Sequence, residues 1–173
     1  MKILETARLT LRQITIDDAA FYLRLLNEPS WLQYIGNKGV RTLADARQSI
    51  LNGPVSMQAR LGFSLYLNEL KGSGVPIGLC GLIKRETLSD IDIGFAFLPE
   101  YWGKGYAYEA AAAVVDYATH KIGLTRLVAI TSPENTSSIR LLERLGLTFD
   151  RNITLSGDGE ETKLFAKNFA LTE

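Results

Sequence analysis

The stretch from residue 91 to residue 118 constrains the fold of this chain most, because it joins a strand to a helix through a turn with two glycines. Large and small residues alternate over 91–97, and an alanine-rich stripe of helical period begins near Tyr106. Between them, Gly103 and Gly105 let the backbone adopt conformations that a side chain forbids. This order of strand, turn and helix predicts one βαβ crossover in a mixed α/β sheet.

The remaining sequence supplies the other elements of that sheet. Apolar and polar residues alternate over 8–14, which predicts a strand, and two Thr-x-x-Asp capping patterns then predict two helices. We expect the first helix to end at Pro29 and the second to break at Gly53-Pro54. The predicted order is strand, two helices, three antiparallel strands, helix, strand, helix and two strands. The strands cover 62–70, 75–84, 91–97, 125–131, 147–155 and 160–169, and the later helices begin near residues 106 and 135.

The two faces of the predicted strand 91–97 differ. One face carries isoleucines and phenylalanines and is expected to lie in the core. The other carries Asp92, Gly94 and Ala96. That small face either packs a helix closely or leaves room for a ligand, and the sequence favours neither reading.

Composition narrows the class of protein. A length of 173 residues with 46% hydrophobic residues predicts a single domain over 1–173 with a full core. Nineteen basic and nineteen acidic residues cancel, so we expect neither nucleic acid nor a membrane as partner. The lone Cys80 forms no internal disulfide, and no Cys/His cluster is present to hold a metal. No signal sequence or membrane-spanning run is apparent, which predicts a cytoplasmic protein.

The glycine turn has the character of a phosphate site, because the amides that begin a helix have no partner inside it and the helix dipole favours an anion. Two common phosphate loops are excluded. A Walker loop needs Ser or Thr after Gly-Lys, where this chain has Gly105, and Tyr108 occupies the third glycine position of the dinucleotide fingerprint. A second helix start, at Asn135 and Ser138, follows one strand later and is expected at the same edge of the sheet.

Together these segments resemble the GNAT superfamily of N-acetyltransferases. Residues 102–107, Trp-Gly-Lys-Gly-Tyr-Ala, are similar to its acyl-CoA pyrophosphate loop, and Asn135-x-x-Ser138 with Leu-Glu-Arg-Leu-Gly at 142–146 is similar to its second motif. Residues 5–12 (Glu-Thr-Ala-Arg-Leu-Thr-Leu-Arg) and Asp-Ile-Gly-Phe at 92–95 resemble the branch of ribosomal-protein N-terminal acetyltransferases. The resemblance covers nearly the whole chain and implies a GNAT-like fold.

The resemblance also implies roles for individual residues. It places the pyrophosphate of acetyl-CoA on the amides of Trp102, Gly103, Lys104, Gly105, Tyr106 and Ala107, the pantetheine beside Phe97 and Leu98, and the cofactor arm at Asn135. Ser138 becomes the proton donor to the departing thiolate. Asp92 stands where the branch often carries Glu, and it acts as base either directly or through a water molecule. Trp31 and Tyr34 line the substrate mouth or pack in the core.

No motif in the sequence identifies the acceptor amine. A protein or peptide α-amino group is the leading expectation, because an amine of pKa near 8 is about one-tenth neutral at pH 7 whereas lysine is far less so. The alternatives are a small-molecule amine such as a polyamine, an amino acid or a drug, and a non-catalytic acyl-CoA sensor domain. A domain with no CoA site at all is a further, minor alternative. The sequence leaves the oligomeric state open, a homodimer included.

Overall fold

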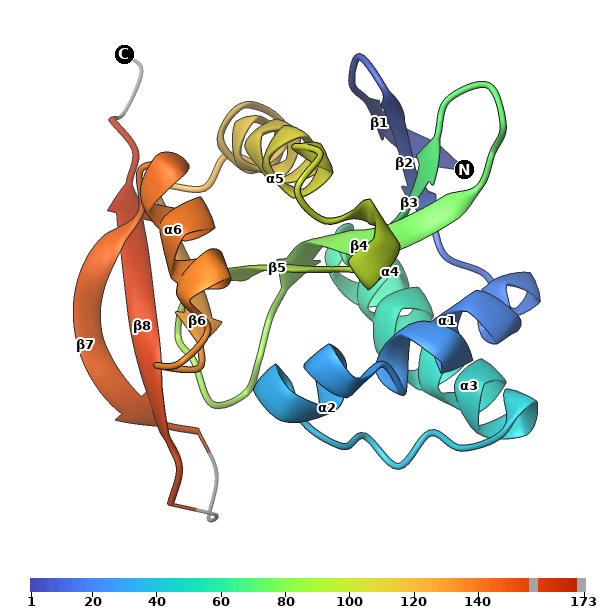
Figure 1. The fold of residues 1–173 in the computed structure, drawn as a ribbon. Helices are drawn as coiled ribbons and strands as arrows, with labels where there is room; N and C mark the ends of the chain where they lie inside the picture. Colours follow the sequence, from blue (N-terminus) through green and yellow to red (C-terminus); the bar gives the residue numbers. More distant parts are fainter. Residues whose placement is uncertain (156–158, 171–173) are drawn as a thin grey trace.

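In the computed structural model, residues 1–155 and 159–170 are described. Their strands form one sheet of eight, in the order β1-β2-β3-β4-β5-β6-β8-β7 (Figure 1). Every neighbouring pair is antiparallel except β5 with β6, which is parallel. The strands are β1 (Lys2–Glu5), β2 (Leu9–Gln13), β3 (Leu65–Leu70), β4 (Pro76–Ile83), β5 (Asp92–Phe97), β6 (Arg126–Thr131), β7 (Thr148–Thr154) and β8 (Glu161–Asn168).

Six α-helices accompany the sheet in the described part of the chain: α1 (Ala19–Leu26), α2 (Pro29–Tyr34), α3 (Leu43–Ile50), α4 (Ser56–Leu61), α5 (Tyr106–Tyr117) and α6 (Thr136–Arg144). Short 3-10 segments at Ile16–Asp18 and Pro99–Tyr101 precede α1 and the glycine turn. Within the described residues, no helix combines the length and the apolar character that crossing a membrane requires.

The helices pack in two layers, one on each face of the sheet (Figure 1). The alanine stripe of α5, with Ala110, Ala111 and Val114 fully buried, and Leu142 of α6 belong to the larger core. Leu25 of α1 and Ile50 of α3 belong to a second core on the opposite face. Small residues on α5 let that helix lie close to the central strands, which fixes where its N-terminus points.

The mixed α/β sheet and the single parallel crossover are confirmed. The predicted element order omitted β1, which precedes β2 across a tight turn at residues 6–8. The first helix ends at Leu26, shortly before Pro29, in agreement with the prediction. The predicted order was wrong in omitting α2, in which Pro29 occupies the first turn, where the missing N–H has no partner to lose.

The expected break at Gly53-Pro54 was also wrong. The helical path continues from α3 through a π-helical turn, Leu51–Val55, into α4. A widened turn of this kind accommodates a proline that an ordinary α-helical turn would exclude.

The small face of β5 is filled where it passes Gly94. A Cβ built on Gly94 would lie 2.9 Å from Cδ1 of Ile83 and 3.4 Å from Cδ2 of Leu65. Ala96, farther along the same face, packs against the second core. Close packing by side chains is therefore the reason for small residues at these two positions.

Candidate active site

The two parallel strands at the centre of the sheet separate soon after they begin. Their ladder has one registered pair, Asp92 with Val128, and beside it the Val128 N–H donates to the Ile91 carbonyl at 3.1 Å. No further β5–β6 pair occurs among the residues described. Because α5 follows β5 and α6 follows β6, both helix N-termini lie at the end where the strands diverge. The opening is thus flanked by two sets of helix-end amides.

The turn before α5 has the backbone geometry that its glycines permit. Gly103 has a φ of +72° and Gly105, the N-cap of α5, a φ of +84°. A Cβ built on Gly103 meets no other heavy atom within 4 Å, so the space above this residue is open. The exposed Lys104 lies between them. Open space, free helix-end amides and a cation fit a pyrophosphate group.

At the end of β5, the main-chain groups of two predicted cofactor residues differ in their availability. The Leu98 N–H donates to the Ile77 carbonyl and the Leu98 carbonyl accepts from Tyr101 N–H, both at 2.9 Å. The alternation of the antiparallel β4–β5 ladder therefore turns the main-chain groups of Phe97 toward the opening. The Phe97 carbonyl accepts a hydrogen bond from the indole Nε1–H of Trp102 at 2.8 Å.

Trp102 is 53% exposed although its indole is held at Phe97. The ring therefore lies over the end of β5, where the pantetheine is expected. A ligand that pairs with the Phe97 carbonyl meets this indole there and either displaces it or shares the oxygen with it, whereas Leu98 has both polar main-chain groups already paired.

Asn135 and Ser138 form the cap of α6. The Asn135 side-chain oxygen accepts a hydrogen bond from the Ser138 N–H at 3.2 Å, which is the geometry of an N-cap. The structural role of Asn135 is thus present, and its amide nitrogen remains the group that could donate to a ligand. The Ser138 side chain is half-buried on the first turn of α6, next to the opening.

Asp92, the predicted base, is almost fully enclosed. Its side chain is 1% exposed, and both of its carboxylate oxygens lie 3.3 Å from Nε of Arg85. The Oδ1 atom is buried without a hydrogen-bond partner in the described structure. Burial raises the pKa of Asp92 above the ordinary value of an aspartate and outweighs the opposing charge of Arg85. Asp92 can therefore act on a solvent-exposed amine only through an intervening group.

The predicted substrate residues lie on α2, on the second-core side of the sheet (Figure 1). Trp31 is half-buried and packs against that core, yet its indole nitrogen is buried with no hydrogen-bond partner in the described structure. Tyr34, three residues later, is half-buried. Desolvation, and then the charge of Arg85, lower the pKa of Lys38 in the loop after α2, although its side chain reaches the surface.

Sequence reasoning missed Arg85, the partner of Asp92, because it lies in the irregular segment 84–91 where no motif marks it. It also missed that Glu109 of α5 binds the turn between β1 and β2. Arg8 had been noted only as part of a motif, and its contact with a residue about a hundred positions away has no local signal.

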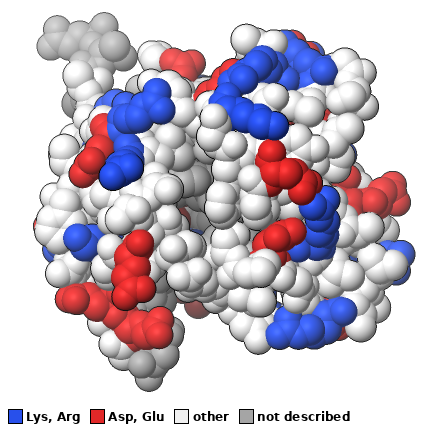
Figure 2. Space-filling model, in the orientation of Figure 1, with Lys and Arg blue, Asp and Glu red and all other residues white. Residues whose placement is uncertain are grey.

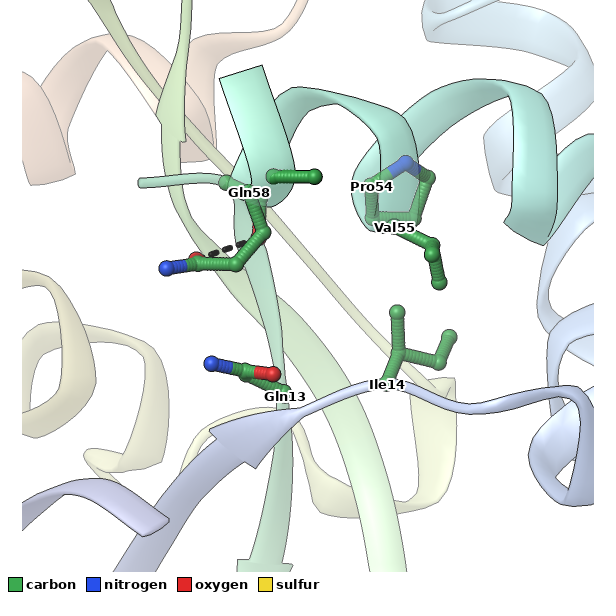
Figure 3. A pocket seen from close by; sticks show the side chains of 7 residues that line it. Gln13, Ile14, Pro54, Val55 and Gln58 are labelled. Carbon is green, nitrogen blue, oxygen red and sulfur yellow. Dashed lines mark hydrogen bonds between the residues drawn. The ribbon is translucent and has the colours of Figure 1, made fainter. Parts of the chain in front are cut away.

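Two pockets of the described structure differ in how close they lie to the predicted site residues. One, of about 280 Å³, is lined by residues 87–90 together with Val128, Arg151 and Leu164. Val128 is the register partner of Asp92, so this pocket adjoins the buried carboxylate. The other, of about 230 Å³, lies between the end of β2 and α4, lined by residues that include Gln13 and Gln58, and no predicted site residue belongs to it (Figure 3).

Charges of both signs are interspersed over the face seen in Figure 2, without a broad area of one sign. The glycine turn nevertheless gathers cationic side chains. Arg8 lies 4.3 Å from the ring centre of Tyr106, and Nζ of Lys104 lies 5.8 Å from that of Tyr101. A few cationic side chains at the turn, on a face of mixed charge, suit a small anionic ligand at the turn better than a nucleic acid bound across the face.

Comparison with known proteins agrees with this geometry. Residues 8–148 match the model of the family described as Acetyltransferase (GNAT) domain. The uncharacterized N-acetyltransferase p20 of Bacillus licheniformis is 32% identical over 149 residues, which cover 84% of this chain and 82% of the relative.

Solved structures share the whole fold. An acetyltransferase from Agrobacterium tumefaciens is 26% identical with a TM-score of 0.82, covering 98% of this chain and 95% of that one. RimL in complex with coenzyme A, a ribosomal L7/L12 alpha-N-protein acetyltransferase, also has a TM-score of 0.82, covering 97% of this chain and 98% of RimL, but at 18% identity it shows the fold alone. The chain belongs to the GNAT family and is an acetyl-CoA-dependent N-acetyltransferase.

Proposed function

We propose that this enzyme acetylates the α-amino group of a protein or peptide. The observation that carries the proposal is the position of Asp92, which is 1% exposed and held by Arg85. A carboxylate enclosed in this way does not contact the acceptor nitrogen, so proton removal runs through water. Such an arrangement suits an acceptor that is already partly neutral.

Amine acidity separates the acceptors. An α-amino group of pKa near 8 is about one-tenth neutral at pH 7, whereas a lysine of pKa near 10.4 is neutral in less than about one part in a thousand. A site with only a relayed base therefore favours the α-amine by roughly two orders of magnitude in the reactive form.

The cofactor has a consistent placement in this proposal. The amides of residues 103–107 hold the pyrophosphate. The Trp102 N–H, which was predicted to join them, already donates to the Pro99 carbonyl at 3.1 Å. The main-chain groups of β5 that face the opening, at Phe97 in particular, pair with the pantetheine. Leu98 then contributes no hydrogen bond to the cofactor, because its polar groups are paired, and its side chain is buried in the second core. Trp102 moves off the Phe97 carbonyl and covers the ligand. Asn135 keeps its capping bond and donates through its amide nitrogen to the cofactor arm.

The reaction requires few groups from the protein. Acetyl-CoA supplies the acetyl group as a thioester. The acceptor nitrogen forms the new C–N bond as the C–S bond breaks, and a strand amide stabilises the charge on the carbonyl oxygen. Ser138 donates its proton to the departing sulfur, and the proton lost by the amine passes through water toward Asp92. A proton from solvent then restores the Ser138 hydroxyl.

RimL, which shares this fold, is named as a ribosomal L7/L12 alpha-N-protein acetyltransferase, so the fold is compatible with an acceptor of the proposed class. The N-terminal residues 5–12 and the segment 92–95 resemble the same branch. We also propose that residues 1–173 act as one domain, because strands from β1 to β8 share a single sheet.

Two matched peptides test the acceptor. One has a free N-terminus and no lysine, and the other has the same sequence with a blocked N-terminus and one lysine. With acetyl-CoA and enzyme, we expect mass spectrometry to find acetylation of the first peptide at a rate at least tenfold above the second. A clear preference for the lysine peptide would refute the proposal. Turnover confined to small amines in a wider panel favours the small-molecule alternative, and binding of acetyl-CoA without any turnover favours the sensor.

A further inference from the structure

The turn between β1 and β2 is bound to the turn before α5, although the two are about a hundred residues apart in the chain. Two of the three residues in the first turn, Thr6 and Arg8, contact Glu109 on the first turn of α5. The Thr6 hydroxyl donates to Oε2 at 2.5 Å, the Arg8 N–H donates to Oε2 at 3.0 Å, and Arg8 Nε donates to Oε1 at 2.8 Å. The carboxylate therefore has hydrogen bonds on both oxygens.

The same arginine continues from Glu109 to the glycine turn. Its Nη1 donates to the carbonyl of Lys104 at 2.9 Å, and its guanidinium lies over the ring of Tyr106. A Cβ built on Gly105 would lie 3.3 Å from Nη2 of Arg8, so the arginine packs directly against the glycine turn. One side chain thus holds the carbonyl at the centre of the turn and the helix that follows it.

The protonation of Glu109 agrees with this geometry. Burial of the carboxylate tends to raise its pKa, but the hydrogen bonds from Thr6 and Arg8 together outweigh burial and lower it. Glu109 is therefore ionised at neutral pH and retains its hydrogen-bond acceptors for Arg8. Its side chain is 20% exposed and that of Arg8 is 45% exposed.

From these contacts we infer that Thr6, Arg8 and Glu109 form a clasp that fixes the glycine turn in the conformation that binds the pyrophosphate of acetyl-CoA. Arg8 and Glu109 are positioning residues in this account. They act on affinity for the cofactor through the backbone of residues 103–107, because a turn with two left-handed glycines has little intrinsic preference for one conformation. The inference rests on the proposed placement of the pyrophosphate.

The direction in which one substitution changes acetyl-CoA affinity distinguishes a positioning role from direct binding of the phosphate. Glu109→Gln removes a negative charge beside the anion site, which on electrostatics alone strengthens the binding of acetyl-CoA. It also frees Arg8, which would strengthen binding further if Arg8 itself held a phosphate. Loss of the clasp predicts the opposite. We expect the Kd for acetyl-CoA to rise about tenfold in Glu109→Gln, with kcat at saturating acetyl-CoA within twofold of the native enzyme.

Arg8→Lys and Arg24→Met complete the series. Arg8→Lys keeps a charge for Glu109 but loses the fork that also reaches Lys104, so we expect it to weaken acetyl-CoA binding as well. Arg24→Met is the matched control, because Arg24 also pairs across the fold, with Glu100 at 2.8 Å just before the glycine turn. Its side chain is 53% exposed, and its loss should leave acetyl-CoA affinity unchanged.

Hydrogen exchange of the ligand-free protein provides a readout that needs no cofactor. The amides of residues 103–107 should exchange at least fivefold faster in Glu109→Gln than in the native protein or in Arg24→Met. Unchanged exchange together with equal or tighter acetyl-CoA binding in Glu109→Gln would overturn the inference. If the native protein binds no acetyl-CoA, the proposed function fails, whereas faster exchange in the variant still shows that the clasp orders the turn.

Discussion

The two halves of the candidate site differ in how firmly their residues are held. The cofactor half comprises the end of β5, the glycine turn and the first turns of α5 and α6. It is held by the N-cap of α6 and by the Arg8–Glu109 contacts around the two left-handed glycines. The acceptor half, which comprises α2, the loop 35–42 and the segment 84–91, consists of a short helix and irregular chain. A rigid site suits a cofactor that is the same for every reaction. The acceptor half can then differ in sequence and specificity without changing the cofactor half.

The largest expected effect is a loss of catalytic rate, with acetyl-CoA binding retained, from a substitution in the cofactor half. Ser138→Ala should lower kcat about a hundredfold, the size typical of a lost proton donor, while acetyl-CoA affinity stays within twofold. Ser137→Ala, an exposed neighbour on the same turn of α6, is the control and should retain full activity. Steady-state kinetics with direct titration of acetyl-CoA measures both. Unchanged turnover in Ser138→Ala would return Ser138 to a purely structural role at the helix start.

An intermediate effect belongs to the acceptor half. Tyr34→Ala should raise the KM for the acceptor about tenfold, which corresponds to the loss of about 1.4 kcal/mol of aromatic contact. The KM for acetyl-CoA should not change. Gln33→Ala, an exposed neighbour on α2, should leave both constants unchanged. A rise in the KM for acetyl-CoA instead would show that α2 serves the cofactor and would remove the distinction between the halves.

The smallest effect concerns the carboxylate at the boundary of the two halves. The pKa of Asp92 is raised by folding, so the folded protein binds its proton more readily than the unfolded chain does, and this residue disfavours folding above that pKa. Arg85 is about one-third exposed and stays hydrated without its partner. Asp92→Asn should therefore raise the melting temperature at pH 7 by about 2–4 °C.

The same linkage fixes the pH dependence. The advantage of Asp92→Asn should shrink as the pH falls through the raised pKa, because native Asp92 then becomes neutral as well. Asp90→Asn is the control, since Asp90 is 37% exposed and paired with Arg126. A lower melting temperature for Asp92→Asn at pH 7 would mean that the Asp92–Arg85 pair stabilises the fold, contrary to this account. Thermal unfolding from pH 4 to pH 8 measures it.

The comparison of the halves also explains what the sequence could predict. The glycine turn, the alanine stripe of α5 and the Asn135 cap are local patterns, and the mixed sheet with one parallel crossover followed from their order. The contacts of Arg8 with Glu109 and of Arg85 with Asp92 depend on which strands become neighbours, so no local pattern carries them. The assignments of Ser138, Asp92 and the cofactor residues stay predictions until they are measured.

The helical region shows a different limit. The first helix does end before Pro29, but Pro29 also begins α2, a helix that the sequence did not predict. Pro54 was interpreted as a break and lies in a π-helical turn. A proline is disfavoured in the interior of an ordinary helix but is tolerated in a first turn, in a widened turn or in a loop. Tertiary packing decides which of these three forms. We expect the same limit for acceptor specificity, because the proposed acceptor half depends on how α2 and two irregular segments meet.

A pair of matched glycine variants tests the central claim, that the turn before α5 holds the pyrophosphate of acetyl-CoA. Gly103 and Gly72 both have positive φ, +72° and +86°, and a Cβ on either meets nothing within 4 Å. Alanine at either position should therefore cost a similar backbone strain of about 1–2 kcal/mol and a similar fall in melting temperature. Calorimetric titration should find acetyl-CoA binding weakened at least tenfold in Gly103→Ala and unchanged in Gly72→Ala. Equal affinity in the two variants would contradict the account.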